Sequence, residues 1–119
     1  MDFKDLDVYK IAMQLGEFTW ELVIKWNYFE KSTIGKQWTE AADSVAANIS
    51  EGEGRYTYPD RKRFYYISRG SLNETETWMS KSFNRKLITL EQRNEYLDMV
   101  NECRKQINIC VLNLKRKIA

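Results

Sequence analysis

Apolar residues recur at spacings of three and four along most of the chain, which is the period of an amphipathic helix. The clearest stretch covers residues 37–55, where the apolar face is built mainly from alanine. Its apolar positions are Trp38, Ala41, Ala42, Val45, Ala46 and Ile49. Because alanine side chains are short, a neighbouring helix can approach this backbone closely. We expect Gly52 and Gly54 to end the helix, since glycine readily adopts the left-handed conformation found at helix ends.

The same periodicity predicts four helices. The first is expected over about residues 5–27, the second from a cap at Ser32 or Thr33 to about Glu51, the third over about 59–83, and the fourth from Thr89 to about 118. Thr57 and Thr89 are predicted N-caps, because Asp60 and Gln92 follow them three residues later. Tyr28 to Ser32 is expected to be a short connection.

The third predicted helix combines apolar and small polar residues on its inward face. The residues expected to face inward are Phe64, Ile67, Ser68, Ser71, Leu72, Thr75, Trp78 and Met79. Gly70 and Ser71 mark a thin point at mid-helix, which we expect to allow a close helix crossing. Trp20, Trp38 and Trp78 are interpreted as core or interface residues.

Four helices with short connections favour antiparallel neighbours. The sequence therefore predicts an all-α, up-down-up-down antiparallel four-helix bundle, with residues 1–119 forming one domain. No strand-like alternation is present in the sequence. No apolar run is long enough to cross a bilayer and no leader opens the chain, so we expect a cytoplasmic protein without membrane contact.

The composition limits the chemistry that the chain can carry. Its 119 residues include two cysteines and no histidine. Cys103 and Cys110 are seven residues apart, or about 10 Å along a helix, which is too far for a disulfide. A zinc site without histidine is improbable. We therefore interpret both cysteines as core residues and expect no metal and no cofactor.

Charge is divided unevenly along the chain. Residues 1–54 carry five basic and ten acidic side chains, whereas residues 55–119 carry fourteen basic and seven acidic ones. This polarity suits contact with nucleic acid, or head-to-tail self-association between acidic and basic surfaces.

A first candidate site consists of carboxylates and amides on the second and third helices. Its members are Asn48, Glu51, Asn73, Glu74 and Glu76. A di-metal centre in a helix bundle usually needs histidine ligands as well. Acid–base catalysis by two carboxylates would need a nucleophile or a cleft that the sequence does not signal. We therefore predict no enzymatic activity, and interpret Asn48, Glu51, Asn73 and Glu74 as a structural hydrogen-bond network.

A second candidate site is the basic, tyrosine-rich segment 55–69. Its expected nucleic-acid-binding residues are Arg55, Tyr56, Tyr58, Arg61, Lys62, Arg63 and Arg69. Cations bind phosphates and tyrosine rings stack on unpaired bases, so this mixture suits single-stranded RNA or DNA. The alternative is a solvated helix face whose tyrosines pack at a helix interface or a subunit interface, since interfaces favour Tyr and Arg. The adaptor hypothesis expects Tyr65 or Tyr66 to be buried between subunits. The basic run 115–117 is expected to complement the dipole of the last helix, with a phosphate contact as the weaker alternative.

Three motifs resemble one known family. They are F-K-D-L-D-V-Y-K-I-A at residues 3–12, S-V-A-A-N-I-S-E-G at 44–52 and R-G-S-L-N-E-T-E-T at 69–77. They are similar to motifs of the four-helix-bundle proteins encoded within 23S rRNA intervening sequences.

This resemblance implies a bundle that assembles as a ring, commonly a homopentamer. It also implies association with nucleic acid, by similarity to the accessory proteins of diversity-generating retroelements, which partner a reverse transcriptase. It implies no catalytic residues, and a structural role for the matched positions Asn48, Glu51, Gly52, Asn73 and Glu74. Two hypotheses follow: weak RNA or DNA binding without strong sequence preference, or a self-assembling adaptor that recruits a protein partner without binding nucleic acid.

Overall fold

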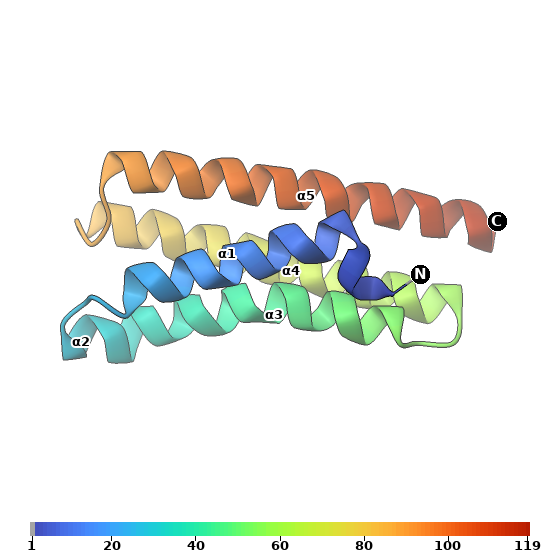
Figure 1. The fold of residues 1–119 in the computed structure, drawn as a ribbon, viewed down its shortest axis with the longest axis horizontal. Coiled ribbons are helices and arrows are strands. Elements are labelled where there is room, and N and C mark those ends of the chain that lie inside the picture. The colour runs from blue at the N-terminus through green and yellow to red at the C-terminus, as the bar shows by residue number, and fades with distance from the viewer. Residues whose placement is uncertain (1) are drawn as a thin grey trace.

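Four long helices lie side by side in the structure, a computed structural model that describes residues 2–119 (Figure 1). They are α1 (Asp7–Val23), α3 (Lys36–Glu53), α4 (Tyr58–Asn84) and α5 (Leu90–Ile118). A 3₁₀ turn at Phe3–Asp5 precedes α1, and the short α2 (Tyr28–Glu30) continues through a π-helical turn at Lys31–Gly35 into α3. The chain reverses direction between successive long helices, and no strand occurs within residues 2–119. The predicted all-α four-helix bundle is confirmed.

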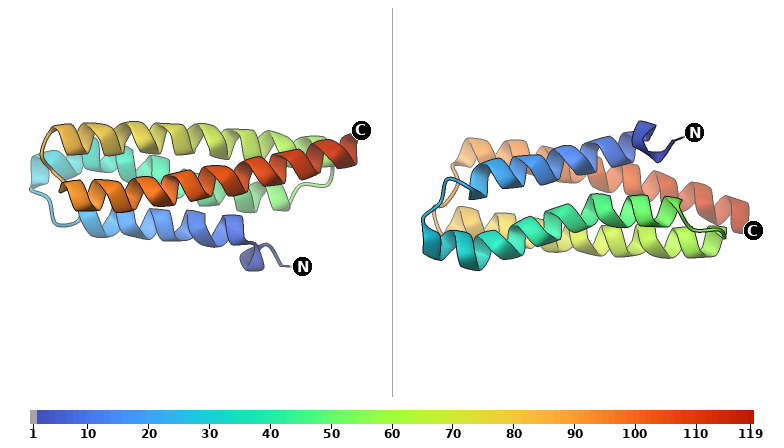
Figure 2. Two further views of the ribbon diagram at one scale, coloured as in Figure 1. Left: turned by 90° about the horizontal axis from the view of Figure 1, so that it is seen from above. Right: turned by 60° about the horizontal axis from the view of Figure 1, so that its bottom comes forward.

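The helices pack in the cyclic order α1, α3, α4, α5, so that each long helix has two main neighbours (Figure 2). The most extensive packing joins α3 to α4, and the least extensive joins α1 to α5. The bundle measures 48 × 23 × 21 Å. None of its helices, over the part of the chain that the structure describes, has the length and apolarity needed to span a membrane.

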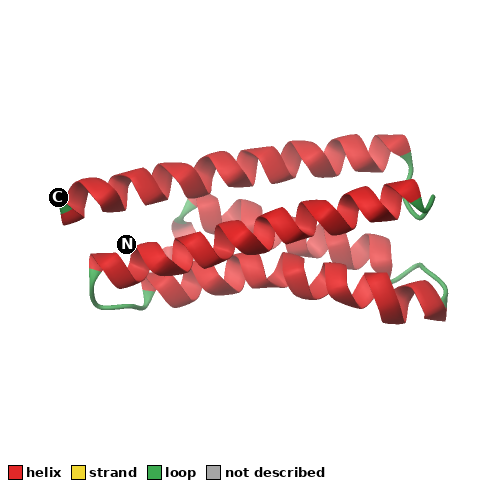
Figure 3. Cartoon of the chain, turned by 180° about the vertical axis from the view of Figure 1, so that it is seen from behind, coloured by secondary structure: helices red, strands yellow, loops and turns green. Residues whose placement is uncertain are grey.

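Both predicted N-caps are present. The Thr57 hydroxyl accepts a hydrogen bond from the Asp60 backbone N–H, with Pro59 in the first turn of α4. The Thr89 hydroxyl accepts from the Gln92 N–H at 3.1 Å, and the Gln92 side chain accepts from the Thr89 N–H at 2.9 Å. These reciprocal bonds form a capping box. The Thr57 cap ends the α3–α4 connection and the Thr89 cap ends the α4–α5 connection (Figure 3).

The predicted start of the second helix is wrong. Asn27 is the N-cap, and the helix begins at Tyr28 rather than at Ser32 or Thr33. The Thr33 hydroxyl donates to the Phe29 carbonyl at 2.7 Å, as it can inside a helix, so it does not cap a new one. Burial of Ile34 against the core stabilises this continuation.

The first helix is shorter than predicted, because it ends at Val23. The chain then turns so that the Trp26 indole N–H donates to the Leu87 carbonyl at 3.1 Å in the α4–α5 connection. The Trp26 ring also stacks on Trp38, with 5.9 Å between centroids. These two contacts hold residues 24–27 against the end of the bundle and out of the helix.

Small residues bring α3 and α4 close together. A Cβ added to Gly52 would lie 2.8 Å from the Cβ of Phe64, so only glycine fits at this crossing. The Ser68 hydroxyl donates to the Val45 carbonyl at 2.8 Å, and the Ser44 and Ser71 hydroxyls lie 3.0 Å apart. The predicted thin point at Gly70 and Ser71 is confirmed only for Ser71, which meets Ser44 of α3. It is wrong for Gly70, because a Cβ there would meet no atom within 4 Å.

Glycine does not end α3 in the way the sequence suggested. Gly54 has φ −85°, and no glycine within residues 2–119 has a positive φ. The Gly54 N–H instead donates to the Ser50 and Glu51 carbonyls. The left-handed conformation occurs after α4, at Lys86 with φ 62°, where the following Leu87 N–H donates to the Ser82 carbonyl at 2.9 Å.

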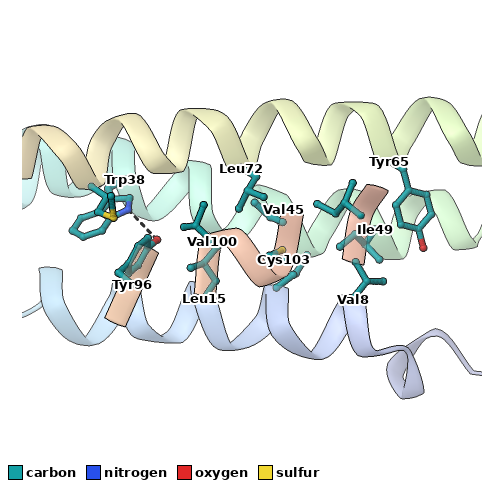
Figure 4. Close-up of a cluster of buried hydrophobic side chains, with 14 of the residues drawn as sticks. Val8, Leu15, Trp38, Val45, Ile49, Tyr65, Leu72, Tyr96, Val100 and Cys103 are labelled. Atoms are coloured by element: carbon teal, nitrogen blue, oxygen red, sulfur yellow. Dashed lines mark hydrogen bonds between the residues drawn. The ribbon is translucent and has the colours of Figure 1, made fainter. Parts of the chain in front are cut away.

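The core runs along the bundle axis between the four helices (Figure 4). Leu15, Val45, Leu72 and Val100 contribute one residue from each long helix. The interpretation of Cys103 as a core residue is confirmed. Cys110 is only half-buried and is a free thiol.

The inward face of α4 differs from the prediction at two positions. Ile67 is exposed, whereas Tyr65 is 1% exposed and lies in the core of its own subunit. The Tyr65 hydroxyl donates to Glu53 at 2.9 Å, which satisfies the phenol at the rim of the core. Tyr65 therefore packs at a helix interface within its own chain and is not available to a subunit interface, whereas half-buried Tyr66 remains the candidate for one.

Candidate nucleic-acid interface

The basic segment starts in the α3–α4 loop and continues along the first three turns of α4. Its cations do not share one environment. Arg55 and Arg63 pair with carboxylates, whereas Arg61, Lys62 and Arg69 form no ion pair among residues 2–119. The structure therefore divides the predicted site into two groups.

Local acids partly neutralise the first group. The Arg55 guanidinium lies 2.7 Å from a Glu51 oxygen and 3.7 Å from Asp60, and the Arg63 guanidinium lies 3.0 Å from the other Asp60 oxygen. Both guanidinium groups also lie over the Phe64 ring, 4.6 and 4.5 Å from its centroid. Asp60, which follows the Thr57 cap, thus lies between two of the five predicted phosphate-binding cations.

The second group lies where α4 faces α5. Lys62, Tyr66 and Arg69 are spaced by four and three residues, so they share one side of α4. The Lys62 ammonium and the Arg69 guanidinium lie 5.8 and 4.9 Å from the Tyr66 ring centroid. Arg69 also donates to the Asn108 side chain on α5 at 3.0 Å. Stacking and hydrogen bonding therefore orient these cations without cancelling their charge.

The antiparallel fold brings a further cation, Lys117, to this face. From the sequence, the basic run 115–117 was expected mainly to complement the dipole of the last helix. The C-terminus of α5 lies at the same end of the bundle as the α3–α4 loop (Figure 1). There the Lys117 ammonium lies 5.2 Å from the Tyr58 ring centroid, and the Arg61 guanidinium lies 5.6 Å from it. The only sequence signal for this contact was the basic run 115–117 at the end of an antiparallel helix.

The two predicted stacking residues differ in their surroundings. Tyr58 is held beneath cations from two helices, as described above. Tyr56 is 96% exposed in the α3–α4 loop. The Arg61 side chain donates to the Arg55 carbonyl at 2.7 Å, which ties this loop to the first turns of α4. Tyr58 thus presents a ring in a fixed position, whereas Tyr56 presents a fully accessible one.

The four residues of the predicted polar network do not hydrogen-bond to one another in the described chain. Asn48 donates to the Ser44 hydroxyl at 2.9 Å, which joins it to the α3–α4 contact. Glu51 pairs with Arg55, and Glu74 accepts from the Trp78 indole at 3.2 Å. Asn73 accepts from Arg104 on α5 at 3.2 Å. The network is therefore divided into local groups, since each side chain binds a neighbour outside the predicted set.

Arg104 on α5 forms an ion pair with Glu76 on α4. Its guanidinium donates to Glu76 at 2.6 Å and to Asn73. A polar cleft of about 480 Å³ opens beside this pair. Its lining consists of Asn73, Glu76, Thr77, Ser80, Lys81, Asn84 and Arg104. Hydroxyl and amide groups thus continue the face that carries Lys62 and Arg69.

The carboxylates and thiols of the described chain are neither grouped as metal ligands nor, for the thiols, activated. Within residues 2–119, no three carboxylate or thiol side chains are grouped to hold a metal ion. Burial raises the pKa of the Cys103 thiol to about 12, and burial also raises the pKa of Cys110. A thiol with a raised pKa is a poor nucleophile, because the thiolate is the reactive form.

These features define an all-α four-helix bundle with a cationic, tyrosine-bearing face. The family model described as 23S rRNA-intervening sequence protein matches residues 4–109, and the chain belongs to this family. The fold is similar to a crystal structure of a protein with unknown function from the S23 ribosomal protein family of Bacteroides thetaiotaomicron. The two chains are 22% identical, with a TM-score of 0.79, and the match covers 87% of this chain and 97% of the other.

Neither comparison places the chain in an enzyme family. A search of curated proteins finds no significant match. The family membership agrees with the resemblance noted in the three sequence motifs.

Proposed function

We propose that the chain is a non-enzymatic, cytoplasmic homo-oligomer that binds the phosphate backbone of RNA or DNA without strong sequence preference. The observation that carries the proposal is the α4–α5 face. There Lys62 and Arg69 flank Tyr66, and Lys117 and Arg61 lie over Tyr58, without ion pairs among the described residues.

The chemistry of this face suits a single strand. Lysine and arginine side chains that form no ion pair with acids can bind phosphates instead. This binding releases counterions from the nucleic acid and supplies affinity that does not depend on base sequence. Tyrosine rings stack on any base that is not already paired. Lys62 and Arg69 are seven residues apart, so about 10 Å of helix separates their backbones and lets them contact different phosphates. Arg55 and Arg63 contribute less, because Glu51 and Asp60 already pair with them.

The test is the affinity of the protein for a fluorescein-labelled single-stranded RNA, measured by anisotropy at increasing salt. The affinity should fall steeply with salt, and each lost phosphate contact should lower the log–log slope by about 0.7. The double variant Lys62→Glu/Arg69→Glu should bind weakly. Its matched control is Lys10→Glu/Lys25→Glu, which makes the same charge change at exposed positions of α1 and its C-terminal turn.

Two results would remove this proposal. One is binding that does not respond to salt. The other is equal loss of affinity in the α4 variant and the α1 control, because that would reflect net charge and not this face. An Arg61→Glu/Arg63→Glu variant is less informative, since Arg63 already pairs with Asp60.

A second candidate function is that of a self-assembling adaptor that recruits a protein partner. The observation that favours it is Trp20, which is 54% exposed on α1 although it is large and apolar. Exposed apolar clusters are typical of protein interfaces. This alternative predicts a stable assembly with no measurable affinity for RNA or DNA in the anisotropy experiment.

A further inference from the structure

The end of the bundle that carries α2, opposite the C-terminus (Figure 1), holds a hollow of about 790 Å³. Its walls come from α2, from the π-helical turn that joins α2 to α3, and from the end of α4 with its connection to α5. The lining includes Phe29, Glu30, Lys36, Gln37, Trp78 and Arg85. The volume is in the range of sites that bind small molecules. The hollow shares no residue with the cationic α4–α5 face.

The π-helical turn between α2 and α3 shapes one wall of this hollow. Such turns are rare in proteins and often occur at functional sites. The Ser32 and Thr33 hydroxyls both donate to the Phe29 carbonyl, at 3.2 and 2.7 Å. Gly35 packs so closely that an added Cβ would lie 2.6 Å from the Val23 side chain. Hydrogen bonds and packing therefore hold a turn of unusual width beside the hollow.

The charged side chains of the hollow have no partners within the described chain. Glu30, Lys36 and Arg85 form no ion pair among residues 2–119. One carboxylate oxygen of Glu30, Oε2, is buried and accepts no hydrogen bond there. A buried acceptor without a donor costs free energy, so its presence in a folded protein needs an explanation. A ligand N–H group that reaches Glu30 would supply the missing donor.

The mixture of charges restricts the kind of ligand. Glu30 would repel a purely anionic ligand, and Lys36 and Arg85 would repel a purely cationic one. A ligand with an anionic group at one end and N–H donors at the other meets both conditions. Phe29 and Trp78 add aromatic surface on which a planar ring can stack. A nucleotide combines these three parts, because it has a phosphate, a planar base and N–H groups on that base.

Among the bases, guanine matches the carboxylate. Its Watson–Crick edge presents two adjacent donors, N1–H and N2–H, whereas adenine, cytosine and uracil place an acceptor beside each donor. Both oxygens of a carboxylate only accept, so a carboxylate binds two adjacent donors and repels an acceptor. The exposed Gln37 amide, which also lines the hollow, is able to donate to the guanine O6 atom.

We propose that this hollow binds a guanine nucleotide. Glu30 accepts from N1–H and N2–H, and Phe29 and Trp78 contact the faces of the base. Lys36 and Arg85 contact the phosphate. A free nucleotide and an unpaired guanosine of an RNA strand present the same groups, so both are sources of this ligand. The inference goes beyond the proposed function, because the α4–α5 face takes no part in it.

The first test is isothermal titration calorimetry of the native protein with guanosine monophosphate (GMP) and adenosine monophosphate (AMP). GMP should bind roughly tenfold more tightly than AMP. Glu30→Gln should lose this preference and shift it towards AMP, because an amide presents one acceptor and one donor side by side, as adenine does. Glu40→Gln is the matched control, since Glu40 is an exposed acid on α3 outside the hollow, and it should keep the preference.

Two further variants separate the phosphate contact from the ring contact. Arg85→Ala should weaken GMP binding but leave guanosine binding unchanged, because guanosine has no phosphate. Lys81→Ala removes an exposed cation of α4 outside the hollow and should change neither. Phe29→Ala should weaken both ligands, and Phe29 is 71% exposed, so its loss should not affect folding. Circular dichroism should show that every variant is folded.

The source of the nucleotide is identified with two single-stranded oligouridylates, one of which carries a single guanosine. Tighter binding of the guanosine-bearing strand in anisotropy, lost in Glu30→Gln, identifies an RNA strand as the source. Equal affinity for the two strands, together with GMP binding, identifies a free nucleotide. Either result supports the proposed ligand.

The inference is overturned if neither the mononucleotides nor the two strands show a preference for guanine, or if Glu30→Gln behaves like Glu40→Gln. It is also overturned if free phenylalanine, a zwitterion with a planar ring, binds the hollow and GMP does not. The Lys62→Glu/Arg69→Glu variant should bind GMP as the native protein does. Failure of the proposed function is therefore seen separately from failure of this site.

Discussion

The indole N–H of Trp38 on α3 donates a hydrogen bond to the phenol oxygen of Tyr96 on α5, across 3.0 Å of the bundle interior (Figure 4). The Tyr96 oxygen also lies 2.6 Å from the Thr19 hydroxyl on α1, and Thr19 donates its own proton to the Leu15 carbonyl. Tyr96 therefore donates to Thr19. One continuous chain of hydrogen bonds links three of the four helices in an otherwise apolar layer.

Replacing Tyr96 with phenylalanine should destabilise the protein by about 1–3 kcal/mol, because it leaves the buried Trp38 N–H without an acceptor. Urea unfolding followed by circular dichroism measures this change. Tyr28→Phe is the control, since Tyr28 is exposed and should change stability by less than about 0.5 kcal/mol. Equal stability of the Tyr96→Phe and native proteins would show that this hydrogen bond contributes nothing to folding.

Two glycines in neighbouring helices should respond in opposite directions to alanine. At Gly52 the new Cβ would meet Phe64 and the Arg61 carbonyl, so Gly52→Ala should cost about 1–3 kcal/mol through overpacking. At Gly70 the new Cβ would meet nothing, so Gly70→Ala should stabilise α4 by about 0.5–1 kcal/mol. Thermal melting of both variants measures the contrast, and a loss in both would contradict the packing described for Gly70.

Lys86 occupies a left-handed conformation that favours glycine. Lys86→Gly should therefore stabilise the protein by up to about 1 kcal/mol at the end of α4. Lys86→Ala serves as the control, because it removes the same ammonium group but keeps a Cβ. Chemical denaturation should show a gain for glycine alone. A similar gain for alanine would assign the effect to the lost charge and not to the backbone.

Asp43 should make stability depend on pH. Its pKa is raised in the folded state by burial and by the nearby Glu17 charge, so the native state binds this proton more tightly than the unfolded state does. Ionised Asp43 consequently destabilises the fold above its folded pKa. Asp43→Asn should melt at a higher temperature than the native protein at pH 7. This advantage should shrink as the pH falls through the folded pKa of Asp43 towards the unfolded value of about 3.9.

Glu21→Gln provides the comparison for that pH series, because it removes one exposed acid from α1, the helix next to the one that carries Asp43. If both variants show the same pH dependence, the effect is one of net charge. A difference confined to Asp43→Asn would assign it to the environment of this carboxyl.

Local patterns in the sequence were sufficient for the class of fold. The spacing of apolar residues predicted the long helices, and the Thr57 and Thr89 caps were predicted correctly, because a capping bond joins residues only three positions apart. The same local reasoning was wrong at Ser32 and Thr33. Their side chains suit a cap equally well, but burial of Ile34 and the fold of residues 24–27 against Leu87 favour an earlier start.

The candidate site was predicted only in outline. The sequence marked segment 55–69 as basic and tyrosine-rich, but it could not separate Arg63, which pairs with Asp60, from the adjacent Lys62, which lies over Tyr66. Nor could it separate buried Tyr65 from half-buried Tyr66. Neighbouring residues on a helix point about 100° apart, so the rotation of α4 against α3 and α5 decides which side each one takes.

By itself, then, the sequence determined four amphipathic helices, two of their caps and an excess of positive charge in the second half of the chain. These properties depend on residues within a turn or two of each other. Only the tertiary structure decided that Lys117 reaches Tyr58, that Arg69 reaches Asn108, and which cations keep their charge uncompensated. Those contacts join residues far apart in the chain, and they exist because antiparallel packing of α4 and α5 buries their apolar faces against a common core.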